Sequence, residues 1–271
     1  MADKPDPFEA SASAIGYVYQ LRKALHACVE LHGNGLDWCL AVEAGDDIEK
    51  VTQGGRTYYQ LKHRRAGVRL TDASTDLWKT LRIWVHAVTN QRIELEETDL
   101  FLLTTANLPE GSAGHFLQPG TSGVRHEVRA LELLQAARDT SASTDNRKAY
   151  EAFDKLSGEE KRRMVARIQV IGNAPTVNDV KDMLLHQAVL AVDRPYARSF
   201  LQRLEGWFLD RAIRQMTTPE MDAITGEEFD QVFTDLRNQF RPENLPIDDD
   251  IAVLEPDASD YADKAFVRNC T

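Results

Sequence analysis

The sequence has few cysteines and no long apolar run, and each shortage excludes a class of protein. Among 271 residues there are three cysteines, Cys28, Cys39 and Cys270, and no two of them form a CxxC pair. A disulfide framework or a zinc site is therefore not expected, and a reducing cytoplasm is the expected location. No apolar run approaches the roughly 18–20 residues of a membrane-spanning helix, so we expect no membrane association.

An excess of positive charge is also missing. The net charge is −11, which is unlike that of a self-sufficient nucleic-acid binder. The distribution is uneven, because residues 62–92 contain seven basic residues against two acidic ones, whereas residues 241–271 contain three basic against eight acidic ones. Such a cluster is most often a solvated face. Its position next to the hairpin described below makes it a candidate binding surface.

Periodic patterns predict strands and helices in the first part of the chain and helices in the rest. Apolar side chains recur at helical spacing in residues 14–32 and 75–89, and strand-like runs occupy residues 37–43, 47–53, 56–63 and 99–106. Further helical patterns lie at 126–138, 146–156, 159–171, 177–191, 195–216 and 226–240. Two of these begin with capping boxes, Thr176 with Asp179 and Thr225 with Glu228.

The change in pattern predicts a division of the chain. We expect an α/β domain at residues 1–122, a helical sensing or assembly region at 123–241, and an acidic linker that leads into a further element at 242–271. We also expect the natural chain to extend past Thr271, because an amphipathic pattern has just begun where the sequence stops.

A hairpin places several polar residues on one face of the predicted sheet. Gly54-Gly55 is suited to a two-residue loop, and with these glycines in the loop Glu49 opposes Gln60 and Asp47 opposes Lys62. Directly opposed residues point to the same face, with Cβ atoms ~4.5–5.5 Å apart. The acids, the amide and the lysine are therefore expected to share a face.

This set of side chains is suited to a hard metal ion, Mg²⁺ or Mn²⁺. Asp47 would supply a carboxylate and the backbone carbonyl of Leu61 a second oxygen. Gln60 would offer a neutral carbonyl oxygen, and Glu43 a further carboxylate from the end of the preceding strand. Lys62 would orient or deprotonate an attacking water, or offset charge that builds on a phosphate.

Two alternatives remain open from the residues alone. A one-residue slip of the hairpin would place Asp46 on this face in the position of Asp47. The same residues would also make an exposed cross-strand ion pair without function, which contributes about 0.2–1 kcal/mol.

The order of these elements resembles the PD-(D/E)XK nuclease superfamily, whose members share the restriction-endonuclease fold. Gln60-Leu61-Lys62 is similar to the QxK form of the motif in Mrr-like enzymes. More of the chain, about residues 10–110, resembles the N-terminal double-stranded DNA endonuclease domain of CD-NTase-associated effectors, which belong to prokaryotic antiphage systems. The segments that carry this resemblance are Gly16-Tyr17 with Gln20, residues 43–48, residues 59–62, residues 77–81 and residues 103–106.

The resemblance implies a fold, an activity and roles for individual residues. The fold would be an α/β restriction-endonuclease-like core, with a mixed central sheet flanked by helices, followed by an α-helical region. The activity would be that of a Mg²⁺-dependent endodeoxyribonuclease, a hydrolase acting on double-stranded DNA. Asp47 matches the metal-binding aspartate, Gln60 the position that is Asp or Glu in other branches, and Lys62 the catalytic lysine. Glu43 and Gln20 match accessory positions.

The charged window adds an expectation about DNA, and the net charge adds one about partners. Arg64, Arg65, Arg69 and Lys79 are expected to contact phosphates beside the site. The acidic balance suggests that tight DNA binding needs a protein partner, a further C-terminal sensor domain, or assembly into a homo-oligomer or hetero-complex. The alternative is a non-catalytic partner-binding or assembly module built on a degenerate nuclease scaffold.

Overall fold

The computed structural model describes residues 7–42, 47–120, 124–218 and 222–241, with side chains from residue 11 onward. The strands are β1 (Trp38–Val42), β2 (Ile48–Thr52), β3 (Gly55–Lys62), β4 (Thr98–Thr104), β5 (Ile168–Ile171) and β6 (Ile224–Thr225). The helices are α1 (Pro7–His32), α2 (Thr75–Thr89), α3 (Ala113–Phe116), α4 (Glu127–Thr140), α5 (Arg147–Asp154), α6 (Gly158–Arg167), α7 (Val177–Ala191), α8 (Ala197–Thr217) and α9 (Gly226–Asn238). Within these ranges, no helix combines the length and the apolar character needed to cross a membrane.

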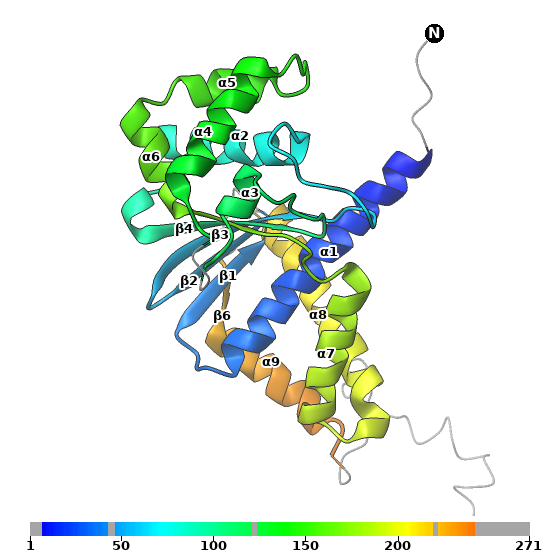
Figure 1. Ribbon diagram of the computed structural model, residues 1–271. Coiled ribbons are helices and arrows are strands. Elements are labelled where there is room, and N and C mark those ends of the chain that lie inside the picture. Colours follow the sequence, from blue (N-terminus) through cyan, green and yellow to red (C-terminus); the bar gives the residue numbers. More distant parts are fainter. Residues whose placement is uncertain (1–6, 43–46, 121–123, 219–221, 242–271) are drawn as a thin grey trace, which may run out of the picture.

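The described strands form a six-stranded mixed sheet in the order β5-β4-β3-β2-β1-β6. Strands β3, β4 and β5 run parallel, whereas β2, β1 and β6 continue the sheet by antiparallel pairing. Parallel neighbours need crossover connections, and these contain α2 and then α3–α6. Figure 1 shows α2, α4, α5 and α6 on one side of the sheet and α1, α7, α8 and α9 on the other. The predicted mixed sheet flanked by helices is confirmed.

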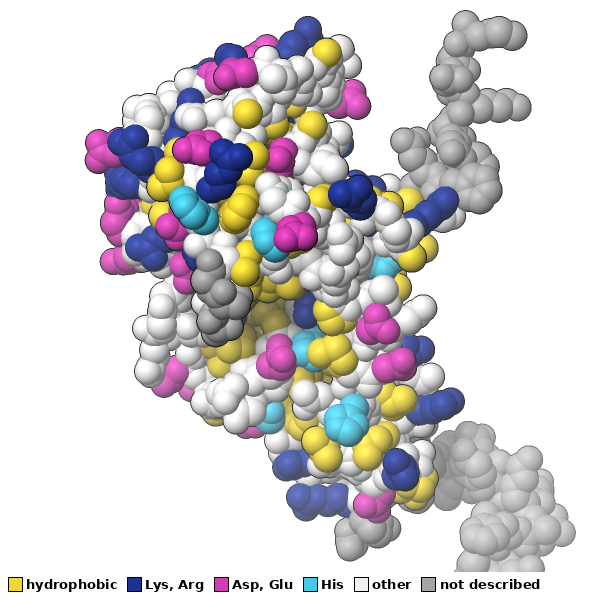
Figure 2. Space-filling model, in the orientation of Figure 1, with side chains coloured by type: hydrophobic (Ala, Val, Ile, Leu, Met, Phe, Trp, Pro, Cys, Tyr) yellow, Lys and Arg dark blue, Asp and Glu magenta, His cyan; other side chains and the backbone are white. Residues whose placement is uncertain are grey.

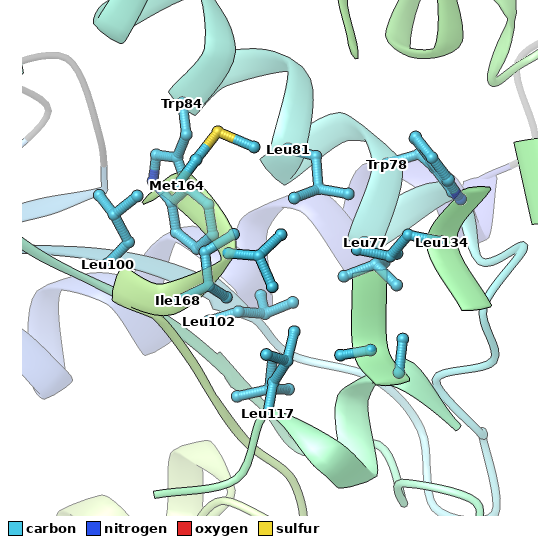
Figure 3. Packing of buried hydrophobic residues seen from close by; sticks show 14 of the residues in the cluster. Leu77, Trp78, Leu81, Trp84, Leu100, Leu102, Leu117, Leu134, Met164 and Ile168 are labelled. Atoms are coloured by element: carbon cyan, nitrogen blue, oxygen red, sulfur yellow. The ribbon is translucent and has the colours of Figure 1, made fainter. Parts of the chain in front are cut away.

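The alternation of side chains along β3 divides the core into two hydrophobic clusters. Tyr58 belongs to the cluster with α2, α4 and α5, whereas Leu61 belongs to the cluster with α1, α7, α8 and α9. The first cluster contains two tryptophans of α2, Trp78 and Trp84, both 0% exposed (Figure 3). A tryptophan that buries about 150–250 Å² stabilises the fold by up to about 4–6 kcal/mol.

Most of the predicted helices are present, and one prediction is wrong at its end. Helices were expected at residues 75–89 and 177–191, and these are the bounds of α2 and α7. The pattern at 159–171 ends as a helix at Arg167, and residues 168–171 form β5 beside β4. Met164 and Val165 continue into the β-branched run Ile168–Ile171 without a break in apolar spacing. The pairing partner that makes this run a strand is far away in the sequence.

The predicted capping box at Thr176 is confirmed in full, and the one at Thr225 is confirmed for the bond made by the threonine side chain. The Thr176 side chain accepts from the Asp179 N–H, and the Asp179 carboxylate accepts from the Thr176 N–H, which completes the box at the start of α7. The Thr225 hydroxyl accepts from the Glu228 N–H at the start of α9. Each cap satisfies a helix N–H that has no partner within the helix.

The hairpin loop lies one residue earlier than predicted. Thr52 pairs with Gly55, so the loop consists of Gln53 and Gly54. Gly55 has a φ of 114°, a conformation that side-chain-bearing residues rarely adopt. A Cβ at Gly55 would also lie 3.1 Å from the carbonyl oxygen of Glu97. Gly55 is therefore required as the first residue of β3, not as a loop residue.

The shift of the loop changes the opposed pairs. Glu49 opposes Tyr58 and not Gln60, and the same register continued by one residue sets Asp47 opposite Gln60 and not Lys62. The predicted oppositions are therefore wrong. The partner changes by two residues, which equals the side-chain period of a strand, so Asp47, Gln60 and Lys62 still share a face.

Candidate active site

Strand β3 and the residue that precedes β2 bring three polar side chains together. Gln60 and Lys62 lie two residues apart on β3 and therefore point to the same face, which is the face of Tyr58. Asp47 directly precedes β2 and lies across from Gln60. The backbone of the hairpin thus places an acid, an amide and a lysine side by side.

The three side chains form a continuous chain of polar contacts. Lys62 Nζ donates to Gln60 Oε1 at 2.9 Å, and Gln60 Nε2 donates to Asp47 Oδ1 at 3.4 Å. Lys62 Nζ lies 3.9 Å from Asp47 Oδ2. Gln60 therefore links the cation to the acid and orients both, because its carbonyl oxygen faces Lys62 and its amide nitrogen faces Asp47.

The backbone of Leu61 fixes the Asp47 carboxylate. The Leu61 N–H donates to Asp47 Oδ2 at 2.6 Å, a short charge-assisted hydrogen bond. The N–H and C=O of one strand residue point to the same neighbouring strand. The Leu61 carbonyl is therefore directed to the side of β3 on which Asp47 lies. The N–H contact could not be predicted from the sequence, because it depends on the register of the hairpin.

The site is largely withdrawn from water. The side chain of Asp47 is 13% exposed and that of Lys62 is 19% exposed, while Gln60 is 2% exposed. Charges in such a position interact more strongly than they do on an open surface, because less solvent screens them. The carboxylate and the ammonium remain accessible enough to meet a ligand.

The oxygen atoms of Asp47 and of the Leu61 carbonyl are of the type that a magnesium ion binds. A carboxylate has about four acceptor positions, and the contacts with Leu61 and Gln60 occupy two of those of Asp47. With the Leu61 carbonyl on the same side, two protein oxygens are available, and Mg²⁺ usually keeps several waters in its shell. Among the described residues there is no group of three or more His, Cys, Asp or Glu side chains suited to a metal. Glu43 and Asp46 lie outside the described residues.

Gln20 and His63 belong to the opposite layer. Gln20 lies in α1, which packs on the Leu61 face of the sheet. The structure therefore does not bring Gln20 onto the face of Asp47 and Lys62. His63 follows Lys62 and contacts Tyr19 of α1, with ring centroids 5.1 Å apart. Burial lowers the pKa of His63 and raises the pKa of Tyr19 to about 12. His63 packs as an uncharged ring.

The basic residues after β3 differ in their surroundings. Arg64 pairs with Asp76 at the start of α2, with Nε 2.6 Å from Oδ2, and this contact raises the pKa of Arg64. Arg65, Arg69 and Lys79 are exposed. On the face shown in Figure 2, Lys and Arg side chains are interspersed with Asp and Glu. The Arg64–Asp76 pair was missed by sequence reasoning, although an acid in the first turn of a helix beside a basic run was a signal for it.

Comparisons with known proteins give limited similarity. No protein-family model matches the chain, and no curated protein sequence matches it. The solved structures that are similar include the Acinetobacter baumannii Cap4 SAVED/CARF-domain containing receptor with the cyclic trinucleotide 3'3'3'-cAAA, at a TM-score of 0.47 and 12% identity over 83% of this chain and 49% of that chain. The same receptor with 2'3'3'-cAAA gives a TM-score of 0.46 and 11% identity over 83% of this chain and 47% of that chain. The chain spans about half the length of these receptors.

Proposed function

We propose that the chain is a Mg²⁺- or Mn²⁺-dependent endonuclease that hydrolyses phosphodiester bonds in double-stranded DNA, as an effector of a prokaryotic antiphage system. The observation that carries the proposal is the linked set of Asp47, Gln60 and Lys62 beside the Leu61 backbone. The antiphage role rests on the sequence resemblance to CD-NTase-associated effectors.

The residues of the site have distinct roles in the proposed reaction. Asp47 and the Leu61 carbonyl would hold the metal, which when bound supplies Lewis acidity and lowers the pKa of a coordinated water. Lys62 would hold the attacking water or the scissile phosphate, because its ammonium group lies 3.9 Å from Asp47 Oδ2 and has further N–H donors beside the one directed to Gln60. Gln60 is a positioning residue, since it accepts from Lys62 and donates to Asp47 while itself buried.

Exposed cations after β3 would place the DNA backbone. Arg65, Arg69 and Lys79 are exposed and suited to phosphate contacts that are independent of sequence and sensitive to salt. Arg64 is held by Asp76, so it would contribute by shaping the start of α2 or by exchanging partners when DNA binds. These contacts position the duplex and do not select a sequence.

Activation would require a protein partner, a C-terminal sensor domain or assembly into a homo-oligomer or hetero-complex. The net charge of −11 opposes the approach of DNA to an isolated chain. The face shown in Figure 2 mixes basic and acidic side chains and has no extended basic area that would compensate. An enzyme of this kind stays inactive until further basic surface is supplied.

Plasmid nicking tests the proposal with matched variants. The chain, purified together with its native partners, is incubated with supercoiled plasmid and Mg²⁺, with and without a chelator. Lys62→Ala should lower the rate by about 10²–10⁴-fold, because it removes a proton-handling group. Lys50→Ala is the control, since Lys50 lies on the same hairpin but over the Tyr59 ring on the other face.

The possible outcomes distinguish a nuclease from a non-catalytic assembly module. Chelator-sensitive nicking that is lost in Lys62→Ala and kept in Lys50→Ala supports the nuclease. Equal nicking by Lys62→Ala and wild type contradicts the proposed site. A wild type that does not nick in the presence of its partners supports the non-catalytic assembly module instead.

A further inference from the structure

A cavity of about 470 Å³ lies between α2 and α5, away from the candidate active site. The two helices lie side by side in Figure 1, and Trp78 of α2 meets the rings of Tyr150 and Phe153 of α5 at centroid distances of 4.5 and 5.6 Å. The volume is within the roughly 300–1,000 Å³ typical of small-ligand pockets. Tyr58, which lines it, is four residues from Lys62 on β3, or about 13 Å along the strand.

Four cations surround this cavity, and no acidic residue lines it. They are Arg82 and Arg92 from α2 and the turn after it, and Lys148 and Lys155 from α5 and its end. Within the described part of the chain, none of the four forms a salt bridge, although many other basic residues do. In a chain of net charge −11, such a concentration of unpaired positive charge indicates an anionic ligand.

The inner surface of the cavity is apolar. Ile83 and Ile93 line it together with Ala152 and the ring of Tyr58. The hydroxyl of Tyr58 donates to Glu49, and Arg56 pairs with that carboxylate, so the negative charge of this acid is offset by a partner that does not line the cavity. A ligand suited to the cavity therefore combines an anionic group at the rim with a flat or apolar group inside.

The turn after α2 holds one of the cations in place. Gln91 has a left-handed φ of 56°, the Gln91 N–H donates to the Val88 carbonyl, and the Arg92 N–H donates to the Ala87 carbonyl at 2.9 Å. This is the Schellman arrangement that ends a helix. It reverses the chain so that Arg92 and Ile93 both line the cavity.

We propose that this cavity binds a phosphorylated small molecule with a ring system, of the nucleotide class. The cations would contact the phosphate, and the Tyr58–Ile83–Ile93 floor would hold the ring. A DNA backbone is less well suited, because the cations encircle a concave apolar space and do not follow a line of phosphates across an open surface. The site is independent of the proposed nuclease chemistry.

Binding of AMP to the full chain tests the proposal. Adenosine serves as the comparison compound for the ring contact, and inorganic phosphate as the one for the contact with the cations. Isothermal titration should show saturable AMP binding that is at least about tenfold tighter than that of either comparison compound, because each lacks one of the two contacts. AMP should also raise the melting temperature as its concentration increases. AMP that does not saturate, or that binds no better than inorganic phosphate, overturns the proposal.

Variants assign the binding to this cavity. The double change Lys148→Ala and Lys155→Ala should lower AMP affinity at least about tenfold, whereas Arg147→Ala, on the same helix but outside the cavity, should change it less than about twofold. Ala152→Phe fills the cavity and should abolish binding while circular dichroism shows an intact fold. AMP binding that survives both changes, or a double variant that loses only affinity for a DNA duplex, overturns the proposal.

Discussion

The carboxylate of Asp47 accepts a 2.6 Å hydrogen bond from the backbone N–H of Leu61, so the residue expected to hold a metal is itself part of the hairpin structure. Asp47 is 13% exposed, and the contact lies beyond the last pair of the β2–β3 ladder. The acid therefore both extends the hairpin and presents charge. These two roles need different substitutions to separate them.

Asp47→Ala should destabilise the fold more than Asp47→Asn does. Alanine leaves the Leu61 N–H without its acceptor, at a cost of about 1–3 kcal/mol, whereas asparagine keeps a side-chain carbonyl that can accept the bond. Urea unfolding measures the difference. If the two variants lose the same stability, the Leu61 contact does not contribute. Asp47→Asn is then the cleaner variant for nicking assays, because it removes the charge and keeps the acceptor.

The shared face of Asp47, Gln60 and Lys62 was predictable from the sequence, although the pairing was not. A strand repeats every two residues, so an error of two residues in the partner keeps every side chain on its face. The position of the loop depended on Gly55, whose conformation and proximity to Glu97 are set by the packing of β3 against the turn before β4. The sequence around Gly55 gives no indication of its contact with Glu97, because the two residues are far apart in the chain.

Other features could not be predicted because they join distant segments. Strand β5 looked like the end of a helix, and its identity comes from pairing with β4 more than sixty residues earlier. The cavity between α2 and α5 combines two cations from the basic window with Lys148 and Lys155, which are separated from that window in the sequence. Composition and periodicity show which residues are basic or apolar, but not which distant helices pack together.

The pH dependence of stability should include a contribution from His63. Burial lowers the pKa of His63 below its usual value of about 6.5, so the unfolded chain takes up this proton first as the pH falls. The contribution of neutral His63 is therefore complete above about pH 6.5 and is lost as the pH falls below that value. His63→Phe keeps a ring against Tyr19 and should flatten the decline in melting temperature between pH 7 and pH 5.

His186→Phe is the matched control for this measurement, because His186 is exposed on α7. The melting temperature of this control should depend on pH as that of the wild type does. Acid unfolding caused by protonation of carboxylates is expected in the wild type and in both variants alike. If the melting temperature of His63→Phe falls with pH in parallel with that of the wild type, His63 does not contribute to the pH dependence of stability.

Removal of the acid from the buried Arg211–Glu228 pair should cost far more stability than removal of the acid from a surface pair. Arg211 is 4% exposed and donates to both carboxylate oxygens of Glu228, at 2.6 and 3.1 Å, linking α8 to α9. Glu228→Ala leaves a buried cation and should cost about 3 kcal/mol, the lower end for buried pairs because Glu228 is 33% exposed.

The surface comparison uses Arg129 and Glu132, which are 2.8 Å apart and more than half exposed. Glu132→Ala should change the free energy of unfolding by less than about 1 kcal/mol. Chemical denaturation of both variants gives the two values. If the two variants lose a similar free energy of unfolding, burial does not determine the cost of breaking these ion pairs.

Two glycine substitutions should act in opposite directions. A Cβ on Gly226 would lie 2.2 Å from the backbone oxygen of Leu36, so Gly226→Ala forces the start of α9 away from the loop between α1 and β1 and should cost about 1–3 kcal/mol or more. Gly206 is exposed within α8, and a Cβ there meets nothing within 4 Å. Gly206→Ala should therefore stabilise by about 0.5–1 kcal/mol. Thermal unfolding tests both, and a Gly226→Ala protein as stable as the wild type would contradict the close approach.

Gln91→Gly should stabilise the protein, because a glutamine occupies the position after α2 where glycine is preferred. Its φ of 56° costs a residue with a Cβ about 1 kcal/mol, and glycine adopts it without that cost. Asn173 has a similar φ of 50°, but asparagine tolerates this conformation better, so Asn173→Gly should gain less. Urea unfolding of the two variants compares these gains directly. A loss of stability in Gln91→Gly would mean that the Gln91 side chain makes a contact worth more than the strain of the turn, and that the turn before Arg92 is held by more than its backbone hydrogen bonds.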